Sequence, residues 1–122
     1  MNLNIDCVKD LLMDIQSFCK PNVHYDCARD EIPERLQKYS YDDILYSARQ
    51  CNKQNLILGY DEYDAGNYFI IEDLTFEGQA FLNNLNNPEV LKTTKEKSSV
   101  LGYALDKIID FVVQFAASLL SR

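Results

Sequence analysis

Few side chains in this sequence are of the types that carry out catalysis. The chain has one histidine, His24, and four cysteines, Cys7, Cys19, Cys27 and Cys51. A reactive thiol needs a nearby base or a helix N-terminus that lowers its pKa, whereas Cys7 lies among acids, which have the opposite effect. The spacings of a serine-nucleophile elbow, a phosphate-binding loop, a dinucleotide fingerprint and a zinc-protease helix are all missing. We therefore expect no enzymatic activity, no small-molecule substrate and no cofactor.

One short stretch could offer ligands to a metal ion. Cys19, His24 and Cys27 follow one another closely, and Cys7 or Cys51 could supply a fourth ligand. Their spacing matches no common zinc module. Thiols in a chain without a secretory signal usually stay reduced and pack as small apolar groups. We expect no metal site.

Pairs of acids are the remaining groups that could carry out chemistry or bind an ion. Asp42-Asp43 and Asp61-Glu62, the latter followed by Asp64, could in principle act as acid and base or bind a cation. The first pair stands at an expected helix start and the second in an expected turn. Carboxylates at such positions usually cap the helix or contact solvent. We interpret these five residues as an acidic surface.

The charge of the chain is unevenly distributed. The net charge is −7, with fifteen acidic and seven basic residues in 1–87, against four acidic and five basic residues in 88–122. A strongly negative body repels nucleic acid and anionic membranes at long range. It is compatible with a basic protein as the partner.

Composition favours a single soluble unit. A chain of 122 residues, 47% of them apolar, can bury one core without disulfides or metals. The first residues, MNLNIDCVKDLL, carry acids where a secretory signal needs a basic segment. We therefore expect a cytoplasmic protein.

Apolar periodicity predicts helices in the first half of the chain. The residues that form the first apolar stripe are Ile5, Val8, Leu11, Leu12, Ile15 and Phe18. Pro21 ends this helix, residues 23–25 are read as extended, and Asp30 is read as the cap of a short helix that runs through Leu36.

A capping box predicts the next helix. Ser40-Tyr41-Asp42-Asp43 has the [ST]xx[DE] pattern, and apolar residues follow, so we expect a helix from about residue 41 to 54. The residues assigned to its outer face and flanks are Asp42, Tyr46, Arg49, Lys53, Asp43, Ser47 and Gln50.

A hairpin and a further helix come next. Two β-rich runs, residues 56–60 and 68–71, flank the polar residues 61–67 and predict a hairpin, with a turn that contains Gly66-Asn67. Thr75 is then expected to cap a helix. The inward stripe expected for that helix is Phe76, Ala80, Phe81 and Leu85.

The last part of the chain is expected to be helical. Asn87-Pro88-Glu89 combines a capping side chain, a proline at the first helical position and an acid in the first turn. From Ser99 onward a last helix is predicted, with a broad apolar face. The residues of that face are Leu101, Leu105, Ile108, Ile109, Val112, Ala116 and Leu119.

Three charged residues argue against a membrane role for the last helix. Asp106, Lys107 and Asp110 lie inside the stretch, whereas a membrane span needs about twenty mostly uncharged residues. The polar face also lacks the run of Lys and Arg of a membrane-surface helix. The apolar face can therefore pack on the rest of the chain or pair with a second copy, and the sequence leaves both open.

The order of the predicted elements indicates the fold class. Helix, short helix, longer helix, β-hairpin and helix is the order of a winged helix-turn-helix. We predict a mostly α fold with a small β-hairpin (α+β). Residues 1–87 would form a winged-helix domain, and residues 88–122 a helical extension that packs on it or mediates self-association.

A family resemblance is carried by three segments, MNLNIDCVKDLLMDI, YSYDDILYSARQCNKQNLI and IEDLTFEGQAFLNNLNNPEVLKTTKEK. In these segments the sequence resembles the DUF2513 family of bacterial and phage proteins and, more distantly, YjcQ-like proteins. Residues 74–78, LTFEG, also match the LT-x-x-G helix start that follows the wing in many bacterial winged-helix families. Departures are Tyr46-Ser47 for a Tyr-His pair, Asn55-Leu56-Ile57 for an AGLI exit, and Leu91 for a tryptophan. The resemblance implies a winged-helix fold and a phage or mobile-element context, and it transfers no catalytic residue.

DNA binding is the usual function of a winged helix, but the acids are unfavourably placed for it. The recognition helix presents its N-terminal part to the major groove, and phosphate contacts come from Lys and Arg. Here Asp42 and Asp43 begin the helix, and residues 61–64 are acidic where the wing would meet the backbone. The candidate nucleic-acid contacts are Arg49, Gln50, Lys53, Lys92 and Lys95.

Three functions are therefore considered, and the first is favoured. In the favoured hypothesis, the protein is a protein-interaction module that binds a second copy of itself, as a homodimer, or an unidentified protein. Alternatively it is a DNA-binding transcriptional regulator whose dimer brings Arg49 and Lys53 to the duplex. A third alternative is an acidic inhibitor that occupies the nucleic-acid-binding site of a host protein.

Overall fold

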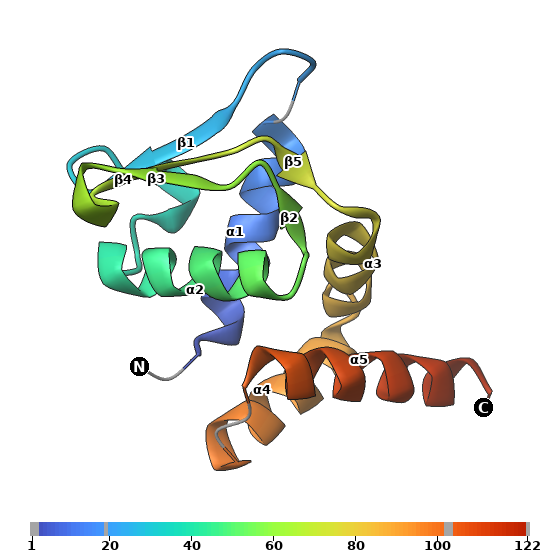
Figure 1. The fold of residues 1–122 in the computed structure, drawn as a ribbon. Coiled ribbons are helices and arrows are strands. Elements are labelled where there is room, and N and C mark those ends of the chain that lie inside the picture. Colours follow the sequence, from blue (N-terminus) through green and yellow to red (C-terminus); the bar gives the residue numbers. More distant parts are fainter. Residues whose placement is uncertain (1–2, 19, 102–103, 122) are drawn as a thin grey trace.

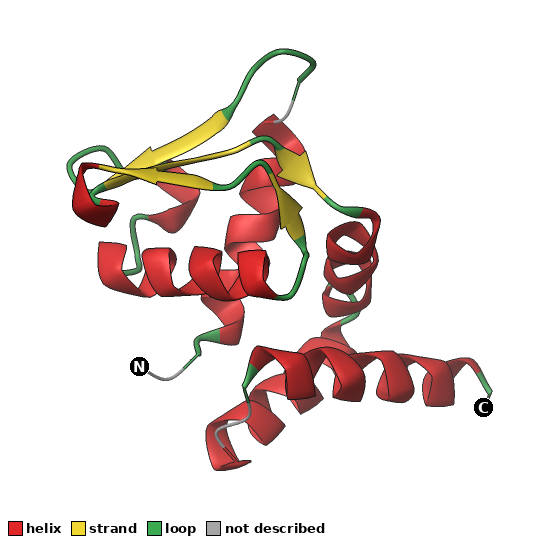
Figure 2. Ribbon diagram, in the orientation of Figure 1, coloured by secondary structure: helices red, strands yellow, loops and turns green. Residues whose placement is uncertain are grey.

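The computed structural model describes residues 3–18, 20–101 and 104–121, and for residues 100 and 101 it describes only the backbone. The helices of this part are α1 (Ile5–Phe18), α2 (Tyr41–Lys53), α3 (Phe76–Leu85), α4 (Pro88–Leu101) and α5 (Leu105–Leu120). The strands are β1 (Tyr25–Ala28), β2 (Ile57–Leu58), β3 (Asp61–Tyr63), β4 (Tyr68–Ile71) and β5 (Asp73–Leu74). Short 3-10 turns cover Glu34–Leu36 and Asp64–Gly66. The predicted mostly α fold with a small antiparallel sheet is confirmed (Figure 2).

The main sheet has three antiparallel strands in the order β1-β4-β3. Tyr25 lies opposite Ile71 in the first pair, and Asp61 lies opposite Ile70 in the second. Strands β2 and β5 form a separate two-stranded ladder. Helices α1 and α2 lie on one side of the main sheet, and no helix among the described residues covers its other side (Figure 1).

The core forms between that inner face of the sheet and the first two long helices. Side chains alternate between the two faces of a strand, and the inner positions of β1 and β4 are almost fully buried. The buried residues of β1, β4, α1 and α2 include Tyr25, Cys27, Phe69, Ile71, Leu11, Leu12, Ile15, Ile44, Ala48 and Cys51. The predicted stripe of α1 is confirmed from Ile5 to Ile15, but Phe18, which was also assigned to it, is 47% exposed.

Helix α2 begins as predicted. The Ser40 hydroxyl accepts a hydrogen bond from the Asp43 backbone N–H at 3.1 Å, which confirms the N-cap. Ser47, however, was expected beside the outer face and is buried. Helix α1 packs against this side of α2 and places the Cys7 thiol beside the Ser47 hydroxyl. A hydroxyl in the middle of a polar-looking sequence can therefore belong to the buried side.

The segment between β1 and α2 differs from expectation. Strand β1 begins at Tyr25, so only the last of residues 23–25 belongs to it. The short helix is a single 3-10 turn that begins at Glu34, after Pro33, and not at Asp30. Residues 28 and 31 pair across a tight turn instead, which places Asp30 within that turn.

The turn of the hairpin contains Gly66-Asn67, as predicted, but the assignment of residues 61–63 to the turn was wrong. These polar residues form β3, and the turn comprises residues 64–67. Gly59 has a φ of +68°, and a Cβ there would lie 2.5 Å from the Glu72 Cβ. This bend separates β2 from β3. The predicted pairing of residues 56–60 with 68–71 was therefore wrong, because β2 pairs with β5 and β4 pairs with β3 and β1. Strand β3 pairs only with β4, and an edge strand tolerates polar residues.

Helix α3 begins at the predicted cap but is rotated relative to the prediction. The Thr75 hydroxyl accepts from the Gly78 N–H at 2.9 Å and donates to the Asn55 carbonyl at 2.6 Å. A Cβ on Gly78 would lie 2.0 Å from the Leu56 carbonyl oxygen, so only glycine allows this approach. Because Gly78 faces inward, so do the residues that follow it at helical spacing, Phe81, Leu82 and Leu85.

Two residues of the predicted α3 stripe are consequently on the surface. Phe76 is 85% exposed and Ala80 is exposed. Phe81 and Leu85 are buried, as expected. The sequence contained the cue for this rotation, since Gly78 at the third position of α3 marks a close backbone approach.

The C-terminal part forms two helices. Asn87 caps α4 as predicted, because its side-chain oxygen accepts from the Glu89 N–H at 2.9 Å. The last helix was predicted to start at Ser99, but α4 extends through Leu101 and α5 starts at Leu105. Ala104 before it has an extended backbone conformation, which does not continue a helix.

The apolar face of α5 packs on α3 and α4 of the same chain (Figure 1). Leu105, Ile108 and Val112 are fully buried there. The remaining described residues of the predicted face, Ile109, Ala116 and Leu119, are half-buried, and the side chain of Leu101 lies outside the described residues. In this structure the face therefore contributes to the core of one chain.

In the part of the chain that the structure describes, no helix has both the length and the apolar character needed to cross a bilayer.

Ile108→Ala should lower the free energy of unfolding by about 3 kcal/mol, because it leaves a cavity where α5 meets the core. Urea denaturation measures the change. Val113→Ala on the same helix is the matched control, because Val113 is 56% exposed, and it should change stability by less than about 0.5 kcal/mol. An Ile108→Ala protein of unchanged stability but altered oligomeric state would contradict this assignment.

Candidate interaction surface

An ion pair joins helix α2 to strand β3. Arg49 donates from Nε to Glu62 Oε2 and from Nη2 to Glu62 Oε1, both at 2.7 Å. The Tyr60 hydroxyl donates to the same carboxylate. Tyr60 and Glu62 are two residues apart, so they share one side of the chain, whereas Asp61 and Tyr63 lie on the other. The hairpin thus brings a carboxylate onto the exposed face of α2.

Both partners of this ion pair are charged at physiological pH. The Arg49 guanidinium, with help from the Tyr60 hydroxyl, lowers the pKa of Glu62 from 4.5 to about 2. The same hydrogen bonds raise the pKa of Arg49 above its ordinary value. Burial, followed by the bond to Glu62, raises the pKa of Tyr60. Glu62 is therefore ionised, and both donor positions of the Arg49 fork that face it are occupied.

A second basic side chain is held at the start of α2. Arg29 Nη2 lies 3.1 Å from Asp42 Oδ1, and Arg29 Nε donates to Asn67 Oδ1 at 2.7 Å. Its guanidinium carbon lies 4.6 Å from the centre of the Tyr41 ring. Arg29 was not among the predicted site residues, because no local pattern in the sequence relates it to Asp42 or Asn67.

The five candidate nucleic-acid contacts do not form one basic surface. Arg49, Gln50 and Lys53 lie on α2, whereas Lys92 and Lys95 lie on α4. Lys95 Nζ is 2.8 Å from Asp6 Oδ2 on α1, so it also has an acidic partner. The side chains of Lys53 and Lys92 are exposed, and Gln50 is half-buried.

The predicted acidic residues lie on α2 and on the hairpin. Asp42 and Asp43 begin α2, Asp61 and Glu62 lie on β3, and Asp64 begins the turn at the hairpin tip. Arg29 and Arg49 balance Asp42 and Glu62 respectively. Among the described residues, no basic side chain forms an ion pair with the other three acids. The surface around α2 and the hairpin is therefore negative on balance.

The cysteines described by the structure are buried thiols. Burial raises the pKa of Cys7 to about 11 and the pKa values of Cys27 and Cys51 to about 12. A thiol of that pKa is protonated and unreactive at neutral pH. Cys19 lies outside the described residues.

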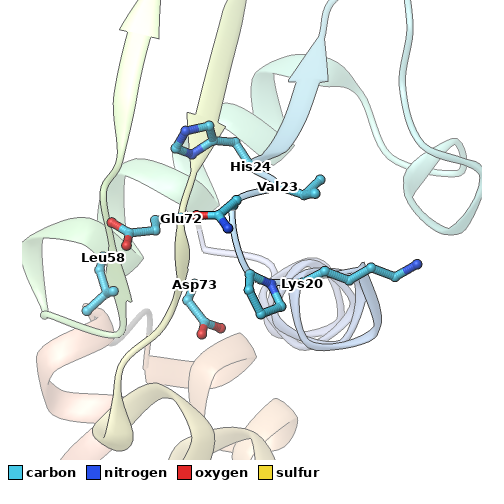
Figure 3. A pocket seen from close by; sticks show the side chains of 8 residues that line it. Lys20, Val23, His24, Leu58, Glu72 and Asp73 are labelled. Carbon is cyan, nitrogen blue, oxygen red and sulfur yellow. The ribbon is translucent and has the colours of Figure 1, made fainter.

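The single histidine lies on the surface, away from the buried thiols. His24 lines a pocket with Leu58, Glu72 and Asp73, and all four side chains are exposed (Figure 3). Within the described residues, no group of three or more His, Cys, Asp or Glu side chains is placed to hold a metal ion. The candidate ligands Cys27 and His24 therefore lie in different environments. Cys27 is in the core, and His24 is exposed to solvent.

A family model described as "Hypothetical protein (DUF2513)" matches residues 2–103. The chain belongs to the DUF2513 family. The part that matches the DUF2513 model includes α2, the hairpin, and α3 with its Thr75–Gly78 start, whereas α5 lies beyond it. No curated protein and no solved structure is significantly similar to this DUF2513 chain.

Glu62→Gln should reduce the free energy of unfolding by about 1 kcal/mol at neutral pH, because it weakens a partly exposed bidentate pair. The pKa of Glu62 is lower in the folded protein, so its contribution is complete above pH 4.5 and is lost as the pH falls toward 2. Urea denaturation at several pH values should show the difference between the two proteins shrinking over that range.

Asp64→Asn is the control for this experiment, because it removes an exposed carboxylate from the same hairpin. It should leave stability nearly unchanged at every pH. A Glu62→Gln effect that is independent of pH would show that the pair does not have the assigned role.

Proposed function

We propose that this protein is a winged-helix module without enzymatic activity that binds another protein through its acidic surface. The order of elements supports the winged-helix interpretation. Helix α2 precedes a hairpin of β3 and β4, and β4 lies between β3 and β1 in the sheet. In this interpretation α2 corresponds to the recognition helix and the hairpin to the wing.

The Arg49–Glu62 pair carries the proposal. A DNA-binding winged helix uses basic side chains of the recognition helix and the wing to contact phosphates. Here the wing supplies the carboxylate that occupies the arginine of the helix. A phosphate would have to displace Glu62 and approach Asp61 and Asp64 within a Debye length of about 10 Å. These contacts oppose binding to DNA and favour a basic protein.

The state of the nucleophilic side chains supports a role without catalysis. The described thiols are buried and protonated, because their pKa values are about 11 to 12. The His24 ring is exposed beside acidic side chains in an open part of the surface. General acid-base catalysis needs such a group to be held against a reacting partner.

Self-association through α5 is a weaker proposal than binding to a different protein. The apolar face that could have paired with a second copy is used within the chain, with Leu105, Ile108 and Val112 buried. Two copies with a net charge of −7 each also repel one another. The proposed partner is therefore a different, basic protein.

Fluorescence anisotropy with mixed duplex DNA, at low and at physiological salt, tests the proposal. We expect no salt-dependent binding by the native protein, because phosphate contacts would have to outweigh the acids. Glu62→Gln releases Arg49 from its carboxylate. It should change the affinity for DNA by less than about threefold, since Asp61 and Asp64 remain.

The opposite result has a distinct signature. Tight binding that falls steeply with salt, and that is lost in a protein with Arg49→Ala and Lys53→Ala, would establish the regulator function and contradict the proposal. A protein with Glu96→Ala and Gln114→Ala, both on exposed positions of α4 and α5, is the control for nonspecific effects of a double substitution.

A further inference from the structure

The outer face of the main sheet has a defined composition. Alternation along β1, β4 and β3 turns Asp26, Ala28, Tyr68, Ile70, Asp61 and Tyr63 away from the helices. The strand register arranges them in two rows, Asp26–Ile70–Asp61 and Ala28–Tyr68–Tyr63. In the part of the chain that the structure describes, this side of the sheet is not covered by a helix (Figure 1).

The middle of this face is aromatic and apolar. The ring centres of Tyr63 and Tyr68 lie 5.9 Å apart, and Tyr63 is 47% exposed. The Tyr63 hydroxyl donates to Asp61 and the Tyr68 hydroxyl donates to Asp26, each at 3.3 Å. The carboxylates thus stand at the edges of a surface whose centre is formed by tyrosine rings and Ile70.

A groove continues the face beyond strand β1. Asp26, Ala28 and Tyr68 form one wall, and the segment that leads to α2 forms the other. That segment contributes Glu31, Ile32, Pro33 and Gln37. The groove therefore has an aromatic ring on one side and carboxylates, Asp26 and Glu31, on both.

The charge of this face has one sign. Of the described residues that point outward from the three strands or line the groove, three are acidic and none is Lys or Arg. The nearest arginine in the sequence, Arg29, is turned toward α2, where it contacts Tyr41 and Asp42. The acids are Asp26, Glu31 and Asp61.

Tyrosine rings flanked by carboxylates are suited to a guanidinium group. A cation over an aromatic face gains from the ring quadrupole, and a carboxylate beside it adds charge-assisted hydrogen bonds. This chain contains an example of that arrangement, because Arg29 lies over the Tyr41 ring and pairs with Asp42. An arginine fits better than a lysine because its planar group can stack and form a hydrogen-bonded fork at once.

We propose that the outer sheet face and its groove bind an arginine-bearing segment of a basic protein. This inference rests on the proposed function for the class of partner, a basic protein. It assigns the contact to a face that shares only Asp61 with the acidic surface around α2 and the hairpin. Nucleic acid is disfavoured because its phosphates would meet Asp26, Glu31 and Asp61. A second copy of this chain is disfavoured because it carries the same charge of −7. A basic segment is the occupant whose charge complements the face.

The test is a titration of the full chain with a short arginine-rich peptide. Nitrogen-proton NMR spectra monitor the binding. The control peptide has the same sequence with citrulline, which keeps the shape of arginine but not its charge. We expect the arginine peptide to shift amides of residues 26–28, 61–63 and 68–70, and the citrulline peptide to leave them unchanged.

Charge-matched variants separate a site from general attraction. Asp26→Asn with Glu31→Gln should weaken binding of the arginine peptide about tenfold. Glu96→Gln with Asp106→Asn removes two exposed acids from α4 and α5, and should weaken it by less than about twofold. The spectra of the free variants report whether each remains folded.

Three results would overturn the inference: no binding of the arginine peptide, equal binding of the citrulline peptide, or equal weakening by the two double variants. Shifts confined to α2 and the hairpin tip would also overturn it. Each of these results leaves the proposed function standing, because that proposal fails on tight, salt-sensitive binding to DNA.

Discussion

A sheet that is covered by helices on one face imposes opposite compositions on the same strands. In this protein the inner positions, Tyr25, Cys27, Phe69 and Ile71, are buried against α1 and α2. The register that buries them also fixes which residues face solvent, because a shift of one residue would exchange the two faces. One strand register therefore determines both the core and the proposed docking surface, and a shift of that register would change both.

Two further contacts extend that constraint to the rest of the molecule. The close approach of Gly78 to the Leu56 carbonyl fixes the rotation of α3. It thereby also fixes the side of α3 that contacts α5. The Arg49–Glu62 pair holds the hairpin over α2. The second contact also determines surface chemistry, since it removes an arginine from the residues that could contact phosphate. Structure and proposed function thus depend on the same few interactions.

Local signals in the sequence were sufficient where a structure is held by local bonds. The caps at Ser40, Thr75 and Asn87 were predicted because each side chain bonds a backbone N–H two or three residues away. The burial of α1 followed from its periodicity. The rotation of α3 was missed because it depends on a contact with Leu56, which is distant in the sequence. Strand β3 was missed because its residues are polar and their hydrogen bonds come from β4.

The candidate site was predictable in its composition but not in its pairing. The acids on α2 and the hairpin were identified from the sequence. Which arginine each one meets, Arg29 with Asp42 and Arg49 with Glu62, depends on tertiary contacts that leave no local pattern. The outer sheet face was not anticipated either. Its tyrosines and acids alternate with core residues, and only the register places them in adjacent rows.

The most direct test of the central claim is a measurement of electrostatic potential at the surface. Paramagnetic relaxation of the protein's protons, compared between a cationic and an anionic nitroxide cosolute, reports the sign of the local potential. The account predicts stronger relaxation by the cationic cosolute at Ala28, Tyr63 and Ile70, because Asp26, Glu31 and Asp61 surround them. Equal relaxation by both cosolutes there, or stronger relaxation by the anionic one, would contradict a surface made for a basic partner.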